Sequence, residues 1–153
     1  MRAAITRTLI LVSALIVLVA VNGSILSKER IRTHGQRIFL ELAAIDPRSL
    51  MQGDYMALHF RLTDNLSPNE SGSAALSIDE RGIATIDRAP TPASPRIRFR
   101  VRNGAIWLGT NAWFYEEGNG ERYAPARYGE FRLDRDTGEA VLVGLADDDL
   151  KPL

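Results

Sequence analysis

The sequence predicts a mainly β protein in which an N-terminal transmembrane helix is followed by an antiparallel β-sandwich or a partly open β-barrel. An uncharged, apolar run from Thr8 to Ser27 is long enough, at about 1.5 Å per residue, to cross about 30 Å of hydrocarbon. Short segments of alternating apolar and polar residues follow, separated by turn signals such as Asn103-Gly104. In a chain of 153 residues, these segments leave room for one core and no second domain.

The apolar run divides the chain into a short cytoplasmic tail (1–7), a transmembrane anchor (8–27), a juxtamembrane helix or linker (28–36) and a β-rich domain (37–153). We expect the helix to stop at Gly35, because glycine is common just past helix ends. A cleaved signal peptide is the alternative, but its apolar region is usually shorter and ends in an Ala-x-Ala pattern. The run here ends without that pattern, which favours a retained signal-anchor.

Basic residues on both sides of the anchor leave its orientation open, since Arg2 and Arg7 precede it and a basic cluster beginning at Lys28 follows it. The tail is short and the domain is large, and long domains cross membranes largely regardless of charge. For a bacterial source we therefore expect a single-pass protein of the cell inner membrane, with its C-terminal domain in the periplasm.

Composition excludes several classes of function. The chain has 19 basic and 19 acidic residues, so the part beyond Arg2 and Arg7 has a small acidic excess, which argues against nucleic-acid binding. The lack of cysteine excludes disulfides, thiolate metal sites and a cysteine nucleophile. Two histidines, His34 and His59, provide little for a metal site, so we expect no metal and no cofactor.

The first two predicted strands of the domain alternate clearly. Residues 37–42 direct Ile38, Leu40 and Leu42 to one face, and residues 55–62 alternate again around His59, which falls on the wetter face. A turn is expected at 46–48 between them. The polar stretch that follows, up to Ala74, is expected to be a loop or a short helix.

Three hairpins complete the domain. The sequence predicts them at 75–78 with 83–86, at 96–102 with 105–108 around Asn103-Gly104, and at 131–133 with 140–143. Three prolines between residues 89 and 95 make that segment a loop. Short strands with regularly spaced turns are typical of a sandwich or barrel.

An arginine stripe lies on one face of the predicted strand 96–102, and it consists of Arg96, Arg98, Arg100 and Arg102. Acidic residues on facing strands commonly neutralise such a stripe, and Asp79, Asp87 and Glu130 are the expected partners. Binding to anionic lipid headgroups is the alternative. Cross-strand pairing is the favoured interpretation.

Two blocks of the chain resemble a known family. The string from Asp46 to Phe60 contains Gly53-Asp54-Tyr55 and Leu58, and a later block runs from Trp113 through Glu117 to Gly118. Together they resemble the GDYXXLXY protein family, with Phe60 in place of the final tyrosine. The resemblance covers roughly residues 36 to 150 and the anchor, and it implies a bacterial, membrane-anchored β-rich domain of uncharacterised function. Because such proteins are often encoded beside polytopic membrane proteins, it also implies that kind of partner.

The favoured hypothesis is a non-enzymatic domain that binds or assembles with a polytopic membrane protein. Aromatic clusters such as Trp113 and Phe114 usually pack in the core, and core packing is the favoured interpretation; because neighbours on a strand point to opposite faces, exposure of one of the two as an anchor for the partner is the alternative. Gly53 and Asp54 suit a tight turn as well as a binding role. The predicted partner-binding residues are Gly53, Asp54, Tyr55, Trp113, Phe114 and Glu117.

A cell-envelope hydrolase is the alternative function. In it, Asp54 and Glu117 act as an acid-base pair, with His59 as a further proton carrier. A Ser-Lys dyad is disfavoured, because the two lysines, Lys28 and Lys151, lie beside the membrane and near the C-terminus. No complete catalytic constellation is present in the sequence, so we expect a protein that is not an enzyme.

Overall fold

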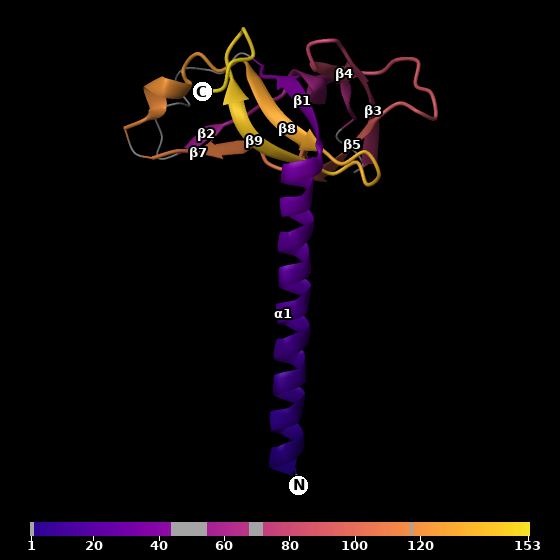
Figure 1. The fold of residues 1–153 in the computed structure, drawn as a ribbon, viewed down its shortest axis with the longest axis vertical. Helices are drawn as coiled ribbons and strands as arrows, with labels where there is room; N and C mark the ends of the chain where they lie inside the picture. The colour runs from indigo at the N-terminus through magenta and orange to yellow at the C-terminus, as the bar shows by residue number, and fades with distance from the viewer. Residues whose placement is uncertain (1, 44–54, 68–71, 117) are drawn as a thin grey trace.

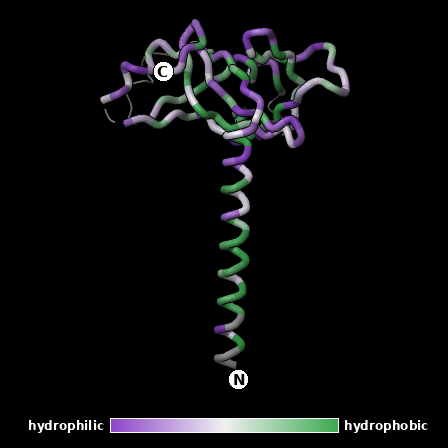
Figure 2. The backbone as a smooth tube through the Cα atoms, in the orientation of Figure 1, coloured by the Kyte–Doolittle hydropathy of each residue, from purple (hydrophilic) through white to green (hydrophobic). Residues whose placement is uncertain are grey.

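The structure is a computed structural model, and it describes residues 2–43, 55–67, 72–116 and 118–153. A single long helix, α1 (Arg2–His34), projects from a compact β domain (Figure 1). The segment Ile5–His34 has a mean hydropathy of 2.6 in its most apolar window, and none of that window is buried against the domain. Figure 2 shows the same helix as an apolar stretch with polar ends. Its length and composition fit a membrane anchor, and a signal sequence near the N-terminus has the same properties.

The last turns of α1 are docked on the domain. Gly35 ends the helix as its sequence predicts, and its N–H donates to the carbonyl of Ile31 over 2.8 Å. Ile31 is 6% exposed, and Lys28 Nζ lies 2.7 Å from Glu139 Oε2. The helix therefore continues into the domain as a fixed element, with no free linker between the two.

The strands of the domain form three antiparallel sheets. The first has the order β1-β8-β9, with β1 (Gln36–Glu41), β8 (Tyr128–Leu133) and β9 (Ala140–Ala146). The second has the order β4-β3-β5-β6, with β4 (Ala84–Ile86), β3 (Gly72–Ile78), β5 (Arg96–Arg102) and β6 (Ala105–Trp107). The third pairs β2 (Tyr55–Ala57) with β7 (Ala112–Phe114), and two short 3-10 helices follow these strands, η2 (Arg61–Asn65) and η3 (Gly120–Tyr123).

Two connections curl the larger sheets toward each other. Phe39 of β1 donates its N–H to the carbonyl of Gly82 over 2.9 Å, which joins the first sheet to the β3–β4 turn. On the other side, the N–H of Arg98 in β5 donates to the carbonyl of Gly138 over 2.7 Å, in the turn between β8 and β9. The result is a curled half-barrel, which confirms the predicted fold class.

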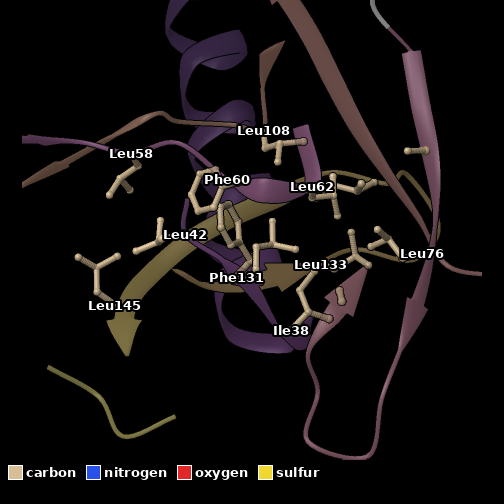
Figure 3. Packing of buried hydrophobic residues seen from close by; sticks show 14 of the residues in the cluster. Ile38, Leu42, Leu58, Phe60, Leu62, Leu76, Leu108, Phe131, Leu133 and Leu145 are labelled. Carbon is tan, nitrogen blue, oxygen red and sulfur yellow. The ribbon is translucent and has the colours of Figure 1, made fainter. Parts of the chain in front are cut away.

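The hydrophobic core fills the space inside this curl (Figure 3). Phe60 and Phe131 meet edge to face at its centre, with ring centroids 5.2 Å apart. Side chains from most strands surround them, and those that are at most 1% exposed include Ile38, Leu40, Met56, Leu76, Ile97, Leu108, Leu133 and Leu145. The alternation predicted for residues 55–62 is confirmed for the buried side, where Met56, Leu58, Phe60 and Leu62 all point into the core.

The predicted continuous strand over 55–62 is wrong, because β2 ends at Ala57 and η2 begins at Arg61. Thr63 explains the change. Its hydroxyl donates to the carbonyl of Phe60 over 2.6 Å and its N–H donates to the same oxygen over 2.9 Å, so this carbonyl is bonded locally.

The predicted hairpins are confirmed. Asn103 and Gly104 both have positive φ, at 51° and 74°, which is the backbone that a two-residue turn of type I′ requires. Between β3 and β4, Asp79 Oδ1 accepts the N–H of Ile83 over 2.7 Å. The predicted turn at 46–48 lies outside the described residues.

Candidate functional site

The two blocks singled out in the sequence meet in space. Strand β2 begins at Tyr55, directly after Gly53-Asp54, and it pairs with β7 in the register Tyr55↔Phe114, Met56↔Trp113 and Ala57↔Ala112. The N–H of Leu58 donates to the carbonyl of Asn111 over 2.8 Å and extends the pairing by one residue. Segments more than fifty residues apart in the sequence thus form one small sheet, which we call the β2–β7 pair.

The outer face of the β2–β7 pair is apolar. Tyr55 is 46% exposed and Phe114 is 72% exposed, and their ring centroids are 5.8 Å apart. Within the described part of the domain beyond α1, these are the only large hydrophobic side chains that are exposed. Neighbouring exposed rings of this kind mark an interaction site more often than isolated ones do.

The inner face of the same pair faces the protein. Met56 is fully buried, and Trp113 packs edge to face on Tyr123, with ring centroids 6.0 Å apart. Tyr115 adds a third ring, 5.5 Å from that of Tyr123. Core packing, the favoured interpretation of this aromatic cluster, therefore holds for Trp113 and is wrong for Phe114, which is exposed.

Two buried polar atoms in the β7 segment lack a hydrogen-bond partner. They are Trp113 Nε1, a donor, and Asn111 Oδ1, an acceptor, while Nδ2 of the same Asn111 donates to the carbonyl of Ile106 over 2.9 Å. An unpaired buried polar atom costs about 1–3 kcal/mol, so native proteins rarely keep one without a reason. Asn111 lies in the Gly109–Gly118 block that resembles the family, so the sequence pointed to its segment although not to the burial of its side-chain oxygen.

The β2–β7 pair extends sideways from the domain, and β7 lies low on it, near the level at which α1 enters (Figure 1). The β2–β7 pair is separate from the two sheets of the half-barrel, and a two-stranded sheet alone is only marginally stable in water. The pair therefore depends on its buried side, Met56 and Trp113, to hold its exposed side in place.

The family comparison covers most of this architecture. A family model described as GDYXXLXY protein matches residues 17–145. The chain belongs to the GDYXXLXY protein family. The match begins within α1 and includes both strands of the β2–β7 pair. No curated protein and no solved structure matches the chain.

The family's string has a clear structural meaning in this member. Tyr55 points outward, whereas Leu58 and Phe60 are 4% and 1% exposed and belong to the core. Phe60 stands where the string has its second tyrosine, and its ring packs on Phe131. A buried phenol would need a hydrogen-bond partner, so phenylalanine suits this apolar position.

The remaining predicted site residues are placed as follows. Gly53, Asp54 and Glu117 lie outside the described residues, so the distance between the proposed acid-base carboxylates stays a prediction. The side chain of His59 is 62% exposed, as its place in the alternation predicted. Its Nε2 lies 2.7 Å from Oδ1 of Asp64 in η2, an acidic partner that the sequence analysis did not consider. Among the described residues, no three His, Cys, Asp or Glu side chains gather in a way that could hold a metal ion.

The favoured interpretation of the arginine stripe is wrong. Among the described residues, Asp79 and Asp87 bond to their own turns, and Glu130 pairs with Arg37 and Arg132. The cross-strand partners of the stripe explain this outcome, because none of them is acidic: Ala75 and Ser73 on β3, and Trp107 and Ala105 on β6.

Proposed function

We propose that this member of the GDYXXLXY family is a non-enzymatic, single-pass membrane protein whose β2–β7 pair binds a polytopic membrane protein. The observation that carries the proposal is the exposed ring pair of Tyr55 and Phe114, held over a buried Met56 and a half-buried Trp113. Aromatic anchors of this kind dominate the energetics of interfaces once a partner covers them.

A partner within the membrane is favoured by the position of this pair. The last turns of α1 are fixed to the domain by the buried Ile31 and by the bond between Lys28 and Glu139, so the domain is held close to the membrane surface. The β2–β7 pair lies low on the domain, within reach of loops that project from a neighbouring membrane protein (Figure 1).

Retention of the anchor is part of the proposal. Cleavage after the apolar run would leave Lys28 and Ile31 on a short, free N-terminal segment, which would weaken both of their contacts with the domain. These contacts favour a signal-anchor over a cleaved signal. For a bacterial source, the large domain then lies in the periplasm and the short tail in the cytoplasm.

The test is photo-crosslinking of the full-length chain in its native membrane. A photoreactive phenylalanine analogue at position 114 or 55 is expected to link one and the same protein with several transmembrane helices. Thr85 on β4 is also exposed and gives the matched control position, from which that product is absent. Recovery of no membrane protein from positions 114 and 55, or of the same product from position 85, would contradict the proposal.

The hydrolase alternative has one supporting contact, since Asp64 can orient the imidazole of His59 as a carboxylate does in proton-transfer sites. Both side chains are more than half exposed, at 62% and 57%, whereas such sites normally exclude water. If the chain nevertheless cleaves envelope peptides or glycans, substitution of Asp54 by Asn and of His59 by Ala should each abolish that cleavage.

A further inference from the structure

We propose that the arginine stripe of β5 binds anionic phospholipid headgroups in the leaflet on the domain's side of the membrane. This contact holds the base of the domain against the membrane. The arginines at 96, 98, 100 and 102 are all exposed. Within the described part of the chain, none of them is in an ion pair. Four guanidinium groups on one strand face repel one another, and this repulsion destabilises the fold unless an anion neutralises their charge.

The position of β5 indicates that headgroups of the membrane supply this negative charge. Lys28 is the first charged residue after the apolar run, so it marks the boundary between hydrocarbon and headgroups. It bonds to Glu139, and the preceding residue, Gly138, accepts the N–H of Arg98 over 2.7 Å. A short path of direct contacts therefore joins the headgroup level of α1 to the middle of the stripe, at the lower side of the domain in Figure 1.

The headgroup layer covers most of the height of the helix that leads to this surface. It is roughly 5 to 7 Å thick on each side of the hydrocarbon, and the helix from Lys28 to His34 rises only about 9 Å. The stem of Arg98 packs beside the β8–β9 turn, where a Cβ on Gly138 would be 3.0 Å from its Cγ. Of the three acidic side chains in that turn, Asp134 bonds to Thr137 and Glu139 to Lys28, and Asp136 forms no ion pair with the stripe in the described part of the chain.

The composition of the face fits the interface as well. Trp107 is the cross-strand partner of Arg100, so its ring shares the arginine face, and Arg102 lies over that ring at 5.7 Å. Tryptophan and arginine are the residues that proteins place at the boundary between lipid and water. The other cross-strand neighbours, Ser73, Ala75 and Ala105, are small and uncharged; Ser73 accepts two hydrogen bonds from Arg96, and none of the three neutralises a guanidinium group.

The test uses the full-length chain in nanodiscs. Because the chain has no cysteine, an Ala105→Cys variant carries a single spin label beside the stripe. In nanodiscs with 30% phosphatidylglycerol, we expect the label to be protected from a water-soluble relaxing agent. In pure phosphatidylcholine, and in 0.5 M salt, that protection should be lost, because salt screens such contacts.

The double variant Arg98→Gln/Arg100→Gln should shift the equilibrium between the membrane-bound and the unbound stripe toward the unbound form, by about fivefold for each arginine removed. Arg81→Gln/Arg88→Gln removes the same charge from exposed positions off this face and should leave the protection unchanged. An unchanged melting temperature shows that the double variant is folded. Equal accessibility in the two lipid compositions, or an equal loss of protection in the control variant, would overturn the proposal. The label could also become protected in pure phosphatidylcholine when inorganic phosphate is added. That result would show that the stripe binds a free anion and not a lipid headgroup, and it would also overturn the proposal.

Discussion

At the scale of single residues, the packing of the core requires a glycine at position 129. Gly129 of β8 lies where a Cβ would be 2.8 Å from Cε1 of Phe60, 3.1 Å from Phe131 and 3.2 Å from Leu142. The ring pair at the centre of the core can approach the sheet only because this position is a glycine. The same strand neighbourhood contains Gly144, whose Cβ would meet nothing within 4 Å.

This pair of glycines gives a matched prediction. Gly129→Ala should reduce the free energy of unfolding by about 1–3 kcal/mol, because the core must shift to admit the methyl group. Gly144→Ala on β9 should change it by less than about 0.5 kcal/mol. Denaturant unfolding of the full-length chain in detergent measures both. Equal losses in the two variants would show that the contact with Phe60 is not the cause.

At the scale of elements, the turn between β8 and β9 is held by one carboxylate. The hydroxyl of Thr137 donates to Asp134 Oδ2 over 2.7 Å, and the N–H of Asp136 donates to Oδ1 over 3.1 Å. These bonds, the first above all, hold the pKa of Asp134 below its ordinary value of 3.8, with a smaller contribution from the charge of Arg30 on α1. The turn also accepts the β5 contact at Gly138, so it supports the curl of the barrel.

The lowered pKa predicts an acid-sensitive turn. A carboxylate with a depressed folded pKa adds stability that is complete above its unfolded pKa, near 3.9, and is lost as the pH falls through the folded pKa. Thr137→Ala should therefore lower the melting temperature at pH 7 and should reduce the loss of stability below pH 4. Thr91→Ala, in the loop before β5, is the control and should leave the acid response unchanged. Parallel acid profiles for wild type and Thr137→Ala would exclude the bond to Asp134 as the cause.

Local sequence predicted most elements correctly where the determining contacts are local. The turn Asn103-Gly104 requires only its own backbone preferences, and the burial of Met56 and Leu58 follows from alternation. The prediction of a strand over 55–62 was wrong because Thr63 bonds to the carbonyl of Phe60. The alternation of apolar and polar residues carries no information about that local bond. The pairing of the arginines failed because it depended on which strands lie beside β5.

At the scale of the whole molecule, the helix and the domain behave as one body. Ile31 is buried in the domain although it belongs to α1, and Lys28 of α1 bonds to Glu139 of the domain over 2.7 Å. The orientation of the domain to α1 is therefore set by packing. Both proposed surfaces, the β2–β7 pair and the arginine stripe, depend on that fixed orientation.

The role of Ile31 can be tested directly. Ile31→Ser should loosen the domain from the helix, so a spin label at position 105 should become more mobile in phosphatidylcholine nanodiscs. Thr33→Ser, at an exposed position in the same turns, is the control. Continuous-wave spectra report the mobility, and unchanged spectra for Ile31→Ser would show that the ion pair of Lys28 is sufficient to fix the junction.

The sequence by itself determined the apolar helix, the β-rich class and the family, because each depends on patterns within neighbouring residues. It favoured core packing for Trp113 and Phe114 and gave exposure of one of them as the alternative, since neighbours on a strand point to opposite faces. Only the tertiary structure decided that Tyr55 lies across from Phe114, and that the arginines of β5 have no acidic cross-strand partner among the described residues. Those outcomes depend on which strands become neighbours, and strand pairing over long separations is chosen by the packing of the whole core.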